Sequence, residues 1–454
     1  MATYAFETIT ASQARALLAT DTLTFASGPS NQVTVLYDPT ALVAAGGAIT
    51  LVAGGRAVEF GAALAAVSQA GRLLVSDGSR LVVGDDSANT ADAPTLAADD
   101  GIYGGGGDDT LQGGGGDDLL QGNAGRDYIV GGPGRDVIYG GQDNDRILCT
   151  APAEPNVEFP RDTGGFAQGN KGNDTIEGTL GVDTLLGGQG NDVIAGFDGL
   201  DVLNGNLGDD ELSGAGLLLG EAGNDRILGS GLADTLMGGD GDDRIYSRGG
   251  AVDGGDGADL IEIGVRGPGG NNTVHGGEGA DTVTAQLASE LTAVDLVFFG
   301  DAGNDSLVGS VLGDTLNGGD GADTLSTYGG GLDDPDVLSG GAGQDNFLIL
   351  NRVSGGPIER LDTARIIDWQ AGDRIDFLAD GFTAGLATNY REMTAGSLAE
   401  ARQAAADLRD QGVLYVASQV GNDVAIFGVS FPFHQASVIL VGRTLADIAF
   451  ENFS

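Results

Sequence analysis

The sequence predicts an all-β fold, a parallel β-roll (β-helix solenoid) with a mainly β amino-terminal cap and an α+β carboxy-terminal cap. Three observations lead to this prediction. A nine-residue pattern recurs through the middle of the 454-residue chain, glycine supplies 82 positions, and 66 acidic residues outnumber 21 basic ones. A fixed short period is typical of a solenoid, in which each coil stacks only on its neighbours.

The repeat begins at Gly104 and reads GGGGDDTLQ, GGGGDDLLQ, GNAGRDYIV, GGPGRDVIY and GGQDNDRIL, five contiguous copies. A second run of five starts at Gly169, and ten further copies start between Gly220 and Gly340, which makes twenty copies. Every copy has an apolar residue at its eighth position and an aspartate at its sixth. These aspartates are the candidate metal ligands: Asp109, Asp118, Asp127, Asp136, Asp145, Asp174, Asp183, Asp192, Asp201, Asp210, Asp225, Asp234, Asp243, Asp259, Asp281, Asp305, Asp314, Asp323, Asp336 and Asp345.

Each copy is expected to form one turn and one short strand. Glycine at positions one, two and four allows the positive φ that a tight turn needs. Three residues of strand follow, and only the middle one points inward. Two nonapeptides then complete one coil, and the coils stack into two parallel sheets around a thin aliphatic core.

The aspartates of successive coils line up along the edges of such a roll, where unscreened carboxylates would repel one another. Calcium is the natural counter-ion, because it accepts six to eight oxygen ligands in irregular geometry. We expect turn carbonyls and the aspartates of repeats i and i+2 to supply these oxygens, so that Asp109 with Asp127 and Asp118 with Asp136 flank successive ions. Pairing repeats in this way predicts about 8 to 18 calcium ions.

The pattern GGxGxDxUx, with U apolar, resembles the repeat of the RTX (repeats-in-toxin, haemolysin-type) calcium-binding family over residues 100–348. The resemblance implies a secreted, extracellular protein and a type I secretion apparatus that reads an uncleaved carboxy-terminal signal. Residues Met1–Thr20 contain no basic stretch followed by an apolar core, so no signal peptide is expected. The tail LADIAFENFS has the acid-and-apolar character of type I signals but lacks the common aspartate followed by four apolar residues.

The chain is expected to divide into three parts. Residues 1–100 form a capping or anchoring domain, residues 101–348 the calcium-binding roll, and residues 349–454 a cap that includes the secretion signal. Within the roll, the proline-containing segment 149–168 is interpreted as an insertion that cannot join the ladder. The longer spacing of repeat starts predicts widened coils over residues 254–300.

Some positions depart from the repeat. Leu232 and Leu312 replace the fourth-position glycine, which predicts weaker calcium binding at two turns. The stretch RIIDWQAGDRIDF resembles the segment that closes the roll in RTX proteins such as the serralysin proteases. Its three aspartates, Asp368, Asp373 and Asp376, either bind a last calcium ion or cap the surface without metal.

The sequence lacks the catalytic motifs that accompany RTX repeats in enzymes. His275 and His434 are the only histidines, too few for the HExxH zinc site, and GxSxG does not occur. Both histidines are interpreted as structural. Cys149 is the only cysteine and is interpreted as incidental rather than nucleophilic, although an exposed thiol could form an intermolecular disulfide. We therefore expect no enzymatic activity.

The first functional hypothesis is a secreted, non-enzymatic RTX protein that folds on extracellular calcium and acts as a cell-surface, surface-layer or matrix component. Its expected partners are cell-surface polysaccharide or further copies of itself. The alternative is a secreted carbohydrate-active enzyme (polysaccharide lyase, epimerase or glycosidase) with its site around Ile263–Phe299, because suitable acids are abundant. The formal charge of −45 argues against nucleic-acid partners. No run of 18 apolar residues occurs, so no transmembrane insertion is expected.

Overall fold

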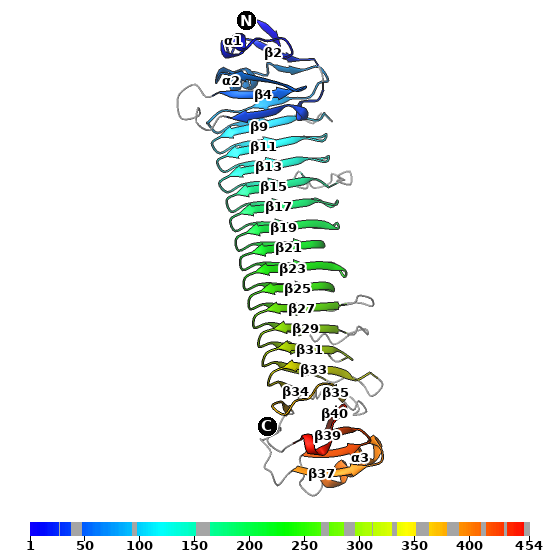
Figure 1. Ribbon diagram of the computed structural model, residues 1–454. Helices are drawn as coiled ribbons and strands as arrows, with labels where there is room; N and C mark the ends of the chain where they lie inside the picture. Colours follow the sequence, from blue (N-terminus) through cyan, green and yellow to red (C-terminus); the bar gives the residue numbers. More distant parts are fainter. Residues whose placement is uncertain are drawn as a thin grey trace. The chain divides into compact units, whose positions relative to one another are not determined.

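The structure is a computed structural model that describes most of the chain. The described residues are 1–26, 28–37, 48–92, 98–150, 164–264, 272–285, 296–310, 312–328, 334–350, 363–378, 390–409, 415–430 and 434–448. The chain divides into two compact units, Met1–Arg226 and Ile227–Ser454, here called unit 1 and unit 2. Each unit contains a parallel β-solenoid, so the predicted β-roll is confirmed (Figure 1).

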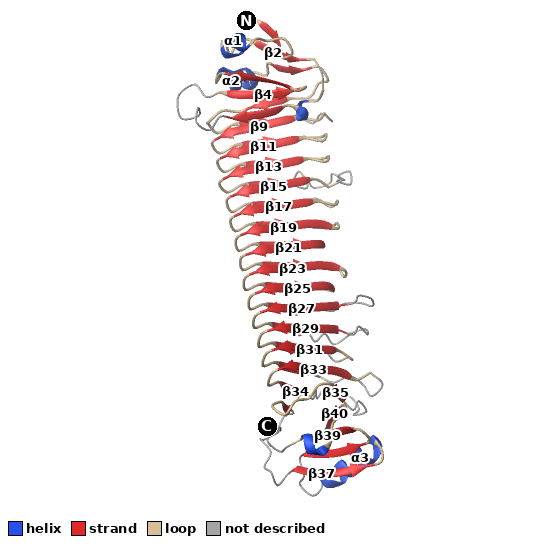
Figure 2. Ribbon diagram, in the orientation of Figure 1, coloured by secondary structure: helices blue, strands red, loops and turns tan. Residues whose placement is uncertain are grey.

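In unit 1, successive strands of the solenoid alternate between two parallel sheets. The stacked arrows of Figure 2 are the strands of the first sheet. The first sheet consists of β7 (Leu81–Val83), β9 (Gly101–Gly106), β11 (Leu119–Ala124), β13 (Val137–Gln142), β15 (Phe166–Lys171), β17 (Thr184–Gln189), β19 (Asp201–Leu207) and β21 (Gly216–Ala222). The second sheet consists of β8 (Thr90–Asp92), β10 (Thr110–Gln112), β12 (Tyr128–Val130), β14 (Arg146–Leu148), β16 (Thr175–Glu177), β18 (Val193–Ala195) and β20 (Glu211–Gly214). Strand β22 (Arg226–Gly229) starts at the last residue of unit 1.

Unit 2 repeats this arrangement. Its first sheet contains β23 (Asp234–Asp240), β25 (Gly250–Asp256), β27 (Asn272–Glu278), β29 (Leu296–Ala302), β31 (Thr315–Asp320), β33 (Asp336–Ala342) and β35 (Thr363–Ile366). Its second sheet contains β24 (Arg244–Ser247), β26 (Leu260–Ile263), β28 (Thr282–Ala285), β30 (Ser306–Val308), β32 (Thr324–Thr327), β34 (Asn346–Leu350) and β36 (Arg374–Leu378).

The strand register confirms that two nonapeptides complete one coil. Leu111 pairs with Ile129, and Leu120 pairs with Ile138, each exactly two repeats on. These eighth-position side chains are fully buried, with 0% exposure. The aliphatic core of the roll is therefore one residue deep per strand, as the two-residue period of a strand requires.

The amino-terminal cap of unit 1 packs two small sheets and two helices over the first coils. Its elements are β1 (Thr3–Ala5), α1 (Ala11–Arg15), β2 (Thr22–Phe25), η1 (Ser30–Gln32), β3 (Thr34–Tyr37), β4 (Ile49–Ala53), β5 (Arg56–Phe60), α2 (Ala63–Gln69) and β6 (Leu73–Val75). The cap core includes Phe60 and Leu64, and Tyr103 from β9 joins the same core. The Tyr103 hydroxyl also donates to the carbonyl of Val33, which ties the cap to the roll.

The carboxy-terminal part of unit 2 combines strands with one longer helix. It contains β37 (Tyr390–Ala395), α3 (Leu398–Arg409), β38 (Tyr415–Val420), β39 (Asp423–Ser430), β40 (His434–Leu440) and η3 (Leu445–Asp447). Strand β40 pairs in parallel with β35 of the roll. The expected α+β cap is thus observed. Among the described residues, no helix combines the length and the apolar content needed to cross a bilayer.

The roll is longer than the predicted range 101–348. Strands β7 and β8 precede it, and β36 follows it in register with β34. Residues 84–92 (GDDSANTAD) form an unrecognised repeat, in which Asn89 takes the place of the aspartate and Ala91 pairs with Leu111. The repeat was not recognised in the sequence because asparagine replaces the aspartate at its sixth position and the small residue alanine stands at its eighth.

The predicted insertion also has different bounds. Cys149 is buried at 3% exposure, and its N–H donates to the carbonyl of Glu177, so it belongs to a coil and not to an exposed loop. At the other end, Phe166 already lies in β15, and Ala167 is fully buried. The suggestion of an exposed Cys149 thiol is therefore wrong.

The strands of the predicted widened coils keep the ordinary register. Val252 pairs with Val274, and Val274 pairs with Phe298, as in the regular coils. The coils therefore do not widen at their strands. The additional residues there (265–271 and 286–295), the centre of the insertion (151–163), the repeat start Gly331 and the tail (449–454) lie outside the described residues.

Candidate metal centres

The glycines of each turn serve two different physical purposes. In the turn before β18, Gly188 and Gly190, at positions two and four, have φ of 128° and 125°, as predicted. Gly187, at position one, needs glycine for another reason. A Cβ there would overlap the Asp192 carboxylate and would lie 2.8 Å from the carbonyl oxygen of Gly205 in the next coil. The first glycine therefore makes room for a carboxylate, and the prediction of positive φ at this position was wrong.

One edge of the roll in each unit carries an unbroken row of buried aspartates, which lies before the strands of the second sheet. In unit 1 the unbroken row is Asp109, Asp127, Asp145, Asp174, Asp192, Asp210 and Asp225. In unit 2 the unbroken row is Asp243, Asp259, Asp281, Asp305, Asp323, Asp345 and Asp373. Every member is at most 3% exposed.

Hydrogen bonds connect the members of each unbroken row. The N–H of Asp109 donates to Oδ1 of Asp127 at 2.8 Å, and Asp127 donates in the same way to Asp145 at 2.9 Å. In unit 2, the bond from Asp243 to Asp259 is 2.8 Å long. This pairing of repeats i and i+2 confirms the predicted neighbours along the edge.

The second carboxylate oxygen of these side chains has no hydrogen-bond partner. This holds, within the described part of the chain, for the buried Oδ2 atoms of Asp109, Asp127, Asp145, Asp174, Asp192, Asp210, Asp259, Asp281, Asp305, Asp323 and Asp345. A buried anionic oxygen without a partner costs several kcal/mol unless a cation or proton is present. Each unbroken row therefore presents a periodic series of buried carboxylate oxygens that can bind cations.

Burial also changes the protonation of these groups in the absence of metal. The pKa of Asp145 is raised to about 8: burial raises it most, the N–H of Asp127 lowers it, and the charge of Asp174 adds to the rise. The same loss of solvation raises the pKa of Asp127 to about 7 and that of Asp174 to about 6. The ionised roll is thus unfavourable at neutral pH unless a cation compensates it.

The donor set fits calcium. Buried Oδ2 atoms lie beside backbone carbonyls of the next coil, as Asp109 lies beside Gly122 around the space above Gly104. No group of three or more histidine, cysteine, aspartate or glutamate side chains has metal-binding geometry among the described residues. Ions here would depend on one or two carboxylates together with carbonyl oxygens, the hard and flexible ligand set that calcium prefers.

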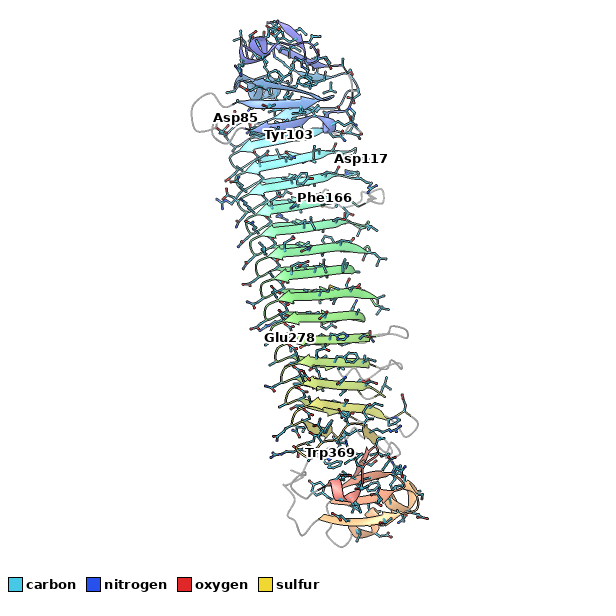
Figure 3. All side chains as sticks on the ribbon, in the orientation of Figure 1. Asp85, Tyr103, Asp117, Phe166, Glu278 and Trp369 are labelled. Carbon is cyan, nitrogen blue, oxygen red and sulfur yellow. The ribbon has the colours of Figure 1, made fainter. Side chains whose placement is uncertain are left out.

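The other predicted aspartates lie on the second edge of the roll, before the strands of the first sheet. They form an interrupted row that consists, with the unpredicted Asp100, of Asp118, Asp136, Asp183 and Asp201 in unit 1 and Asp234, Asp314 and Asp336 in unit 2. Figure 3 labels one turn residue of each edge of unit 1, Asp85 next to β8 and Asp117 next to β11. All twenty predicted aspartates are buried, but they belong to two different rows.

Three further aspartates behave differently from one another. Asp100 is buried and accepts the N–H of Arg80 at 2.6 Å, and the apolar Ile102 two positions later was the signal that could have revealed it. Asp373 ends the unbroken row of unit 2, where its Oδ2 accepts the N–H of Gln370. Asp368 instead accepts hydrogen bonds from the backbone N–H groups of Gly340 and Gly341, so it caps the turn of the preceding coil.

His275 does not lie in a turn. It lies within β27, its Nδ1 is 2.7 Å from Oδ2 of Asp301, and its ring stacks on Phe299 with a centroid distance of 4.6 Å. Both polar side chains remain about two-fifths exposed, at 42% and 41%. The pair therefore faces solvent, whereas the carboxylate rows are buried.

Comparison with known proteins agrees with this arrangement. The family model described as RTX calcium-binding nonapeptide repeat matches residues 96–129, 112–147, 166–194, 177–212, 219–252, 265–286 and 299–331. No curated protein matches the chain. Among solved structures, the extracellular lipase LipA from Serratia marcescens is similar, with 20% identity over 63% of this chain and a TM-score of 0.16. The match spans only 40% of the lipase chain, and likeness at this level carries no argument about activity.

The matched repeats and the periodic buried carboxylates lead to one conclusion. RTX repeat proteins are typically secreted and are exported by type I systems, and their repeats bind calcium. The roll of this chain therefore consists of RTX (haemolysin-type) calcium-binding repeats, which bind multiple calcium ions and support a secreted protein.

Proposed function

We propose that this chain is a non-enzymatic component of the cell surface, a surface layer or the extracellular matrix, and that calcium assembles its roll outside the cell. The proposal is carried by the buried Oδ2 atoms of the unbroken rows that have no hydrogen-bond partner among the described residues, such as those of Asp109, Asp127 and Asp259. Extracellular modules bind calcium at about 10⁻⁴–10⁻³ M, far above the free concentration inside cells. The chain would therefore reach the exporter unfolded and fold only after export.

Exposed apolar side chains on two adjacent turns of unit 1 support a role in assembly. The two turns stack, because the N–H of Asp183 donates to Oδ1 of Asp201 at 3.0 Å. Clusters of large exposed apolar groups are typical of contact surfaces. The apolar turn patch consists of Leu180 (69% exposed), Val182 (63%), Phe197 (51%) and Leu200 (72%).

We propose that the apolar turn patch contacts a second copy of this chain. Phe197 adopts a φ of 66°, which bulky residues rarely do, so the chain accepts strain to present this ring. The formal charge of −45 keeps copies apart without calcium. Calcium bound along the rows removes much of this repulsion and makes the contact calcium-dependent.

Imaging of the full chain in millimolar calcium tests this function. We expect filaments or sheets that disappear in chelator, where the chain is monomeric. The double variant Leu180→Ser, Leu200→Ser should fold in calcium but assemble poorly. Leu260→Ser is the matched control, since Leu260 is an exposed leucine on a sheet face of the roll, at 37%. A monomer in calcium, without affinity for surface polysaccharide, would contradict the proposal.

One observation favours a carbohydrate-active role as the second candidate. The His275–Asp301 pair and the stacked Phe299 lie on the solvent side of β27 and β29, within the region suggested for such a site. An aromatic ring stacked beside an acid–imidazole pair can bind a sugar face and exchange a proton with it. Release of reducing ends from acidic and neutral polysaccharides, and its loss in His275→Ala, would favour this role over a purely structural one.

A further inference from the structure

The two edges of the roll differ in continuity. On the second edge of unit 1, Gly165 occupies the coil between Asp136 and Asp183, since Gly165 donates to Oδ1 of Asp183 at 2.7 Å. In unit 2, Gly250 pairs with Asp234, and Asn272 pairs with Leu296, at the positions where the row requires aspartate. A calcium ion between two coils therefore lacks one or both carboxylates along much of this edge.

Thr179 closes the turn of Asp183. Its backbone N–H and its hydroxyl donate to Oδ2 of Asp183 at 2.7 and 2.9 Å. The same hydroxyl accepts the N–H of Gly181 at 2.9 Å. The carboxylate oxygen that lacks a partner along the unbroken row is here satisfied twice by the protein itself. Thr179 stands at position two, where the repeat has glycine.

Three turns of unit 2 show the same chemistry. The N–H of Ser310 donates to Oδ2 of Asp314 at 2.5 Å, and the Ser310 hydroxyl lies 3.2 Å from Oδ1. The N–H of Gly231 donates to Oδ2 of Asp234 at 2.7 Å. The hydroxyl of Thr327 donates to Oδ2 of Asp336. All four carboxylates are at most 2% exposed, so these hydrogen bonds replace the water molecules that would otherwise solvate them.

The backbone of these turns is also different. Except for the turn of Asp373, the turns of the unbroken rows have positive φ at positions two and four, as Gly239 and Gly241 do with 119° and 129°. Within the described turns 178–183 and 229–234, no residue has positive φ. Their carbonyl oxygens consequently do not take the positions that they have in the turns of the unbroken rows.

We infer that the turns closed by Thr179, Gly231, Ser310 and Thr327 bind no calcium. Calcium binds along the unbroken rows. On the second edge it binds only in the first coils of unit 1, where the N–H of Asp118 donates to Oδ1 of Asp136. The unbroken row of unit 1 has six intervals. The row of unit 2 has five that can hold an ion by the same criterion, because Oδ2 of Asp373 accepts the N–H of Gln370. This gives about eleven ions, with about two more next to Asp118. The roll is therefore cross-linked by metal on one edge and closed by its own hydroxyls and amides over much of the other.

Calcium counting on matched variants of the full chain tests this inference. Asp192→Asn and Asp183→Asn change neighbouring turns on opposite edges of the same region of unit 1. After equilibrium dialysis against calcium, we expect Asp192→Asn to lose one or two ions and Asp183→Asn to lose none. Thr179→Gly restores the repeat at position two, frees Oδ2 of Asp183 and should add about one ion, because Oδ2 of Asp201 in the next coil is unpartnered.

Equal losses from Asp183→Asn and Asp192→Asn would overturn the inference, as would a Thr179→Gly variant that binds no more calcium than the parent chain. If an asparagine variant does not fold, Thr179→Gly and the ion count of the parent chain still decide, with about 13 ions expected rather than 18. These counts do not depend on assembly, so the inference and the proposed surface role can fail separately.

Discussion

Removal of calcium should unfold the roll rather than loosen it. In the calcium-free chain, each unbroken row keeps buried carboxylates without compensation, while the core contributes only one aliphatic side chain per strand. Ordering each residue costs about 1–2 kcal/mol of backbone entropy, which such a thin core offsets poorly. Metal binding and folding should therefore be one coupled event.

The magnitude follows from the eleven intervals of the unbroken rows that hold calcium. At free calcium 10 to 100 times the dissociation constant, each bound ion stabilises the folded state by about 1.4–2.7 kcal/mol. Eleven ions together contribute about 15–30 kcal/mol, at least as much as the 5–15 kcal/mol by which folded domains are usually stable. Loss of this contribution leaves no net stability.

Far-UV circular dichroism of the full chain, titrated with calcium after treatment with chelator, measures the coupling. We expect a cooperative gain of β signal in calcium at about 10⁻⁴–10⁻³ M. Sodium at equal ionic strength should restore little, because it screens close charges weakly, and magnesium should do less than calcium, because it demands a strict octahedron. The same β content in chelator and in calcium would refute the reasoning.

Four further predictions follow from individual features. Burial raises the folded pKa of Asp145 to about 8 and that of Asp174 to about 6, above the unfolded value of about 3.9. Protonation therefore favours the folded calcium-free chain, and circular dichroism in chelator should show β signal at pH 5 that is lost by pH 8. Calcium affinity should fall on acidification. Gly187→Ala should bind less calcium, measured by dialysis, and should lower the free energy of unfolding by about 1–3 kcal/mol through overpacking, measured by thermal melts in calcium. Gly214→Ala is the control and should change neither quantity, because the nearest atoms to its added Cβ lie 3.5 Å away. Ile194→Ala removes a fully buried side chain and should lower the free energy of unfolding in calcium by about 2–5 kcal/mol. Val193→Ala is the control: this neighbouring side chain is 44% exposed, and its removal should lower the free energy by about 0.5 kcal/mol at most. Replacement of residues 151–163 by a short glycine–serine linker should leave the calcium count unchanged, because Cys149 and β15 remain in their coil; a drop in the count would assign that segment to a calcium site.

The nine-residue repeat is sufficient to predict the coil and the chemistry of its edges. Leu111 and Ile129 face inward and Asp109 lies next to Asp127 because a strict nine-residue period places equivalent residues above one another, whatever the rest of the chain does. Each coil contacts only its neighbours, so local sequence is sufficient to define it. The Leu232 and Leu312 substitutions likewise pointed to two turns whose carboxylates the protein now satisfies itself.

Which carboxylate oxygens remain without a partner depends on the folded turns and could not be predicted from the repeat. Asp183 and Asp192 occupy the same position of the repeat. Thr179 donates to Oδ2 of Asp183, whereas Oδ2 of Asp192 has no hydrogen-bond partner among the described residues. The two aspartates therefore differ only in the hydrogen-bond geometry of their folded turns. The burial of Cys149 and the rung at Asn89 were also hidden, because they depend on the strand pairing of neighbouring coils rather than on the repeat letters. A repeat specifies which side chains meet along the edge, but the direction of each donor in the folded turn determines whether they are left for a metal ion.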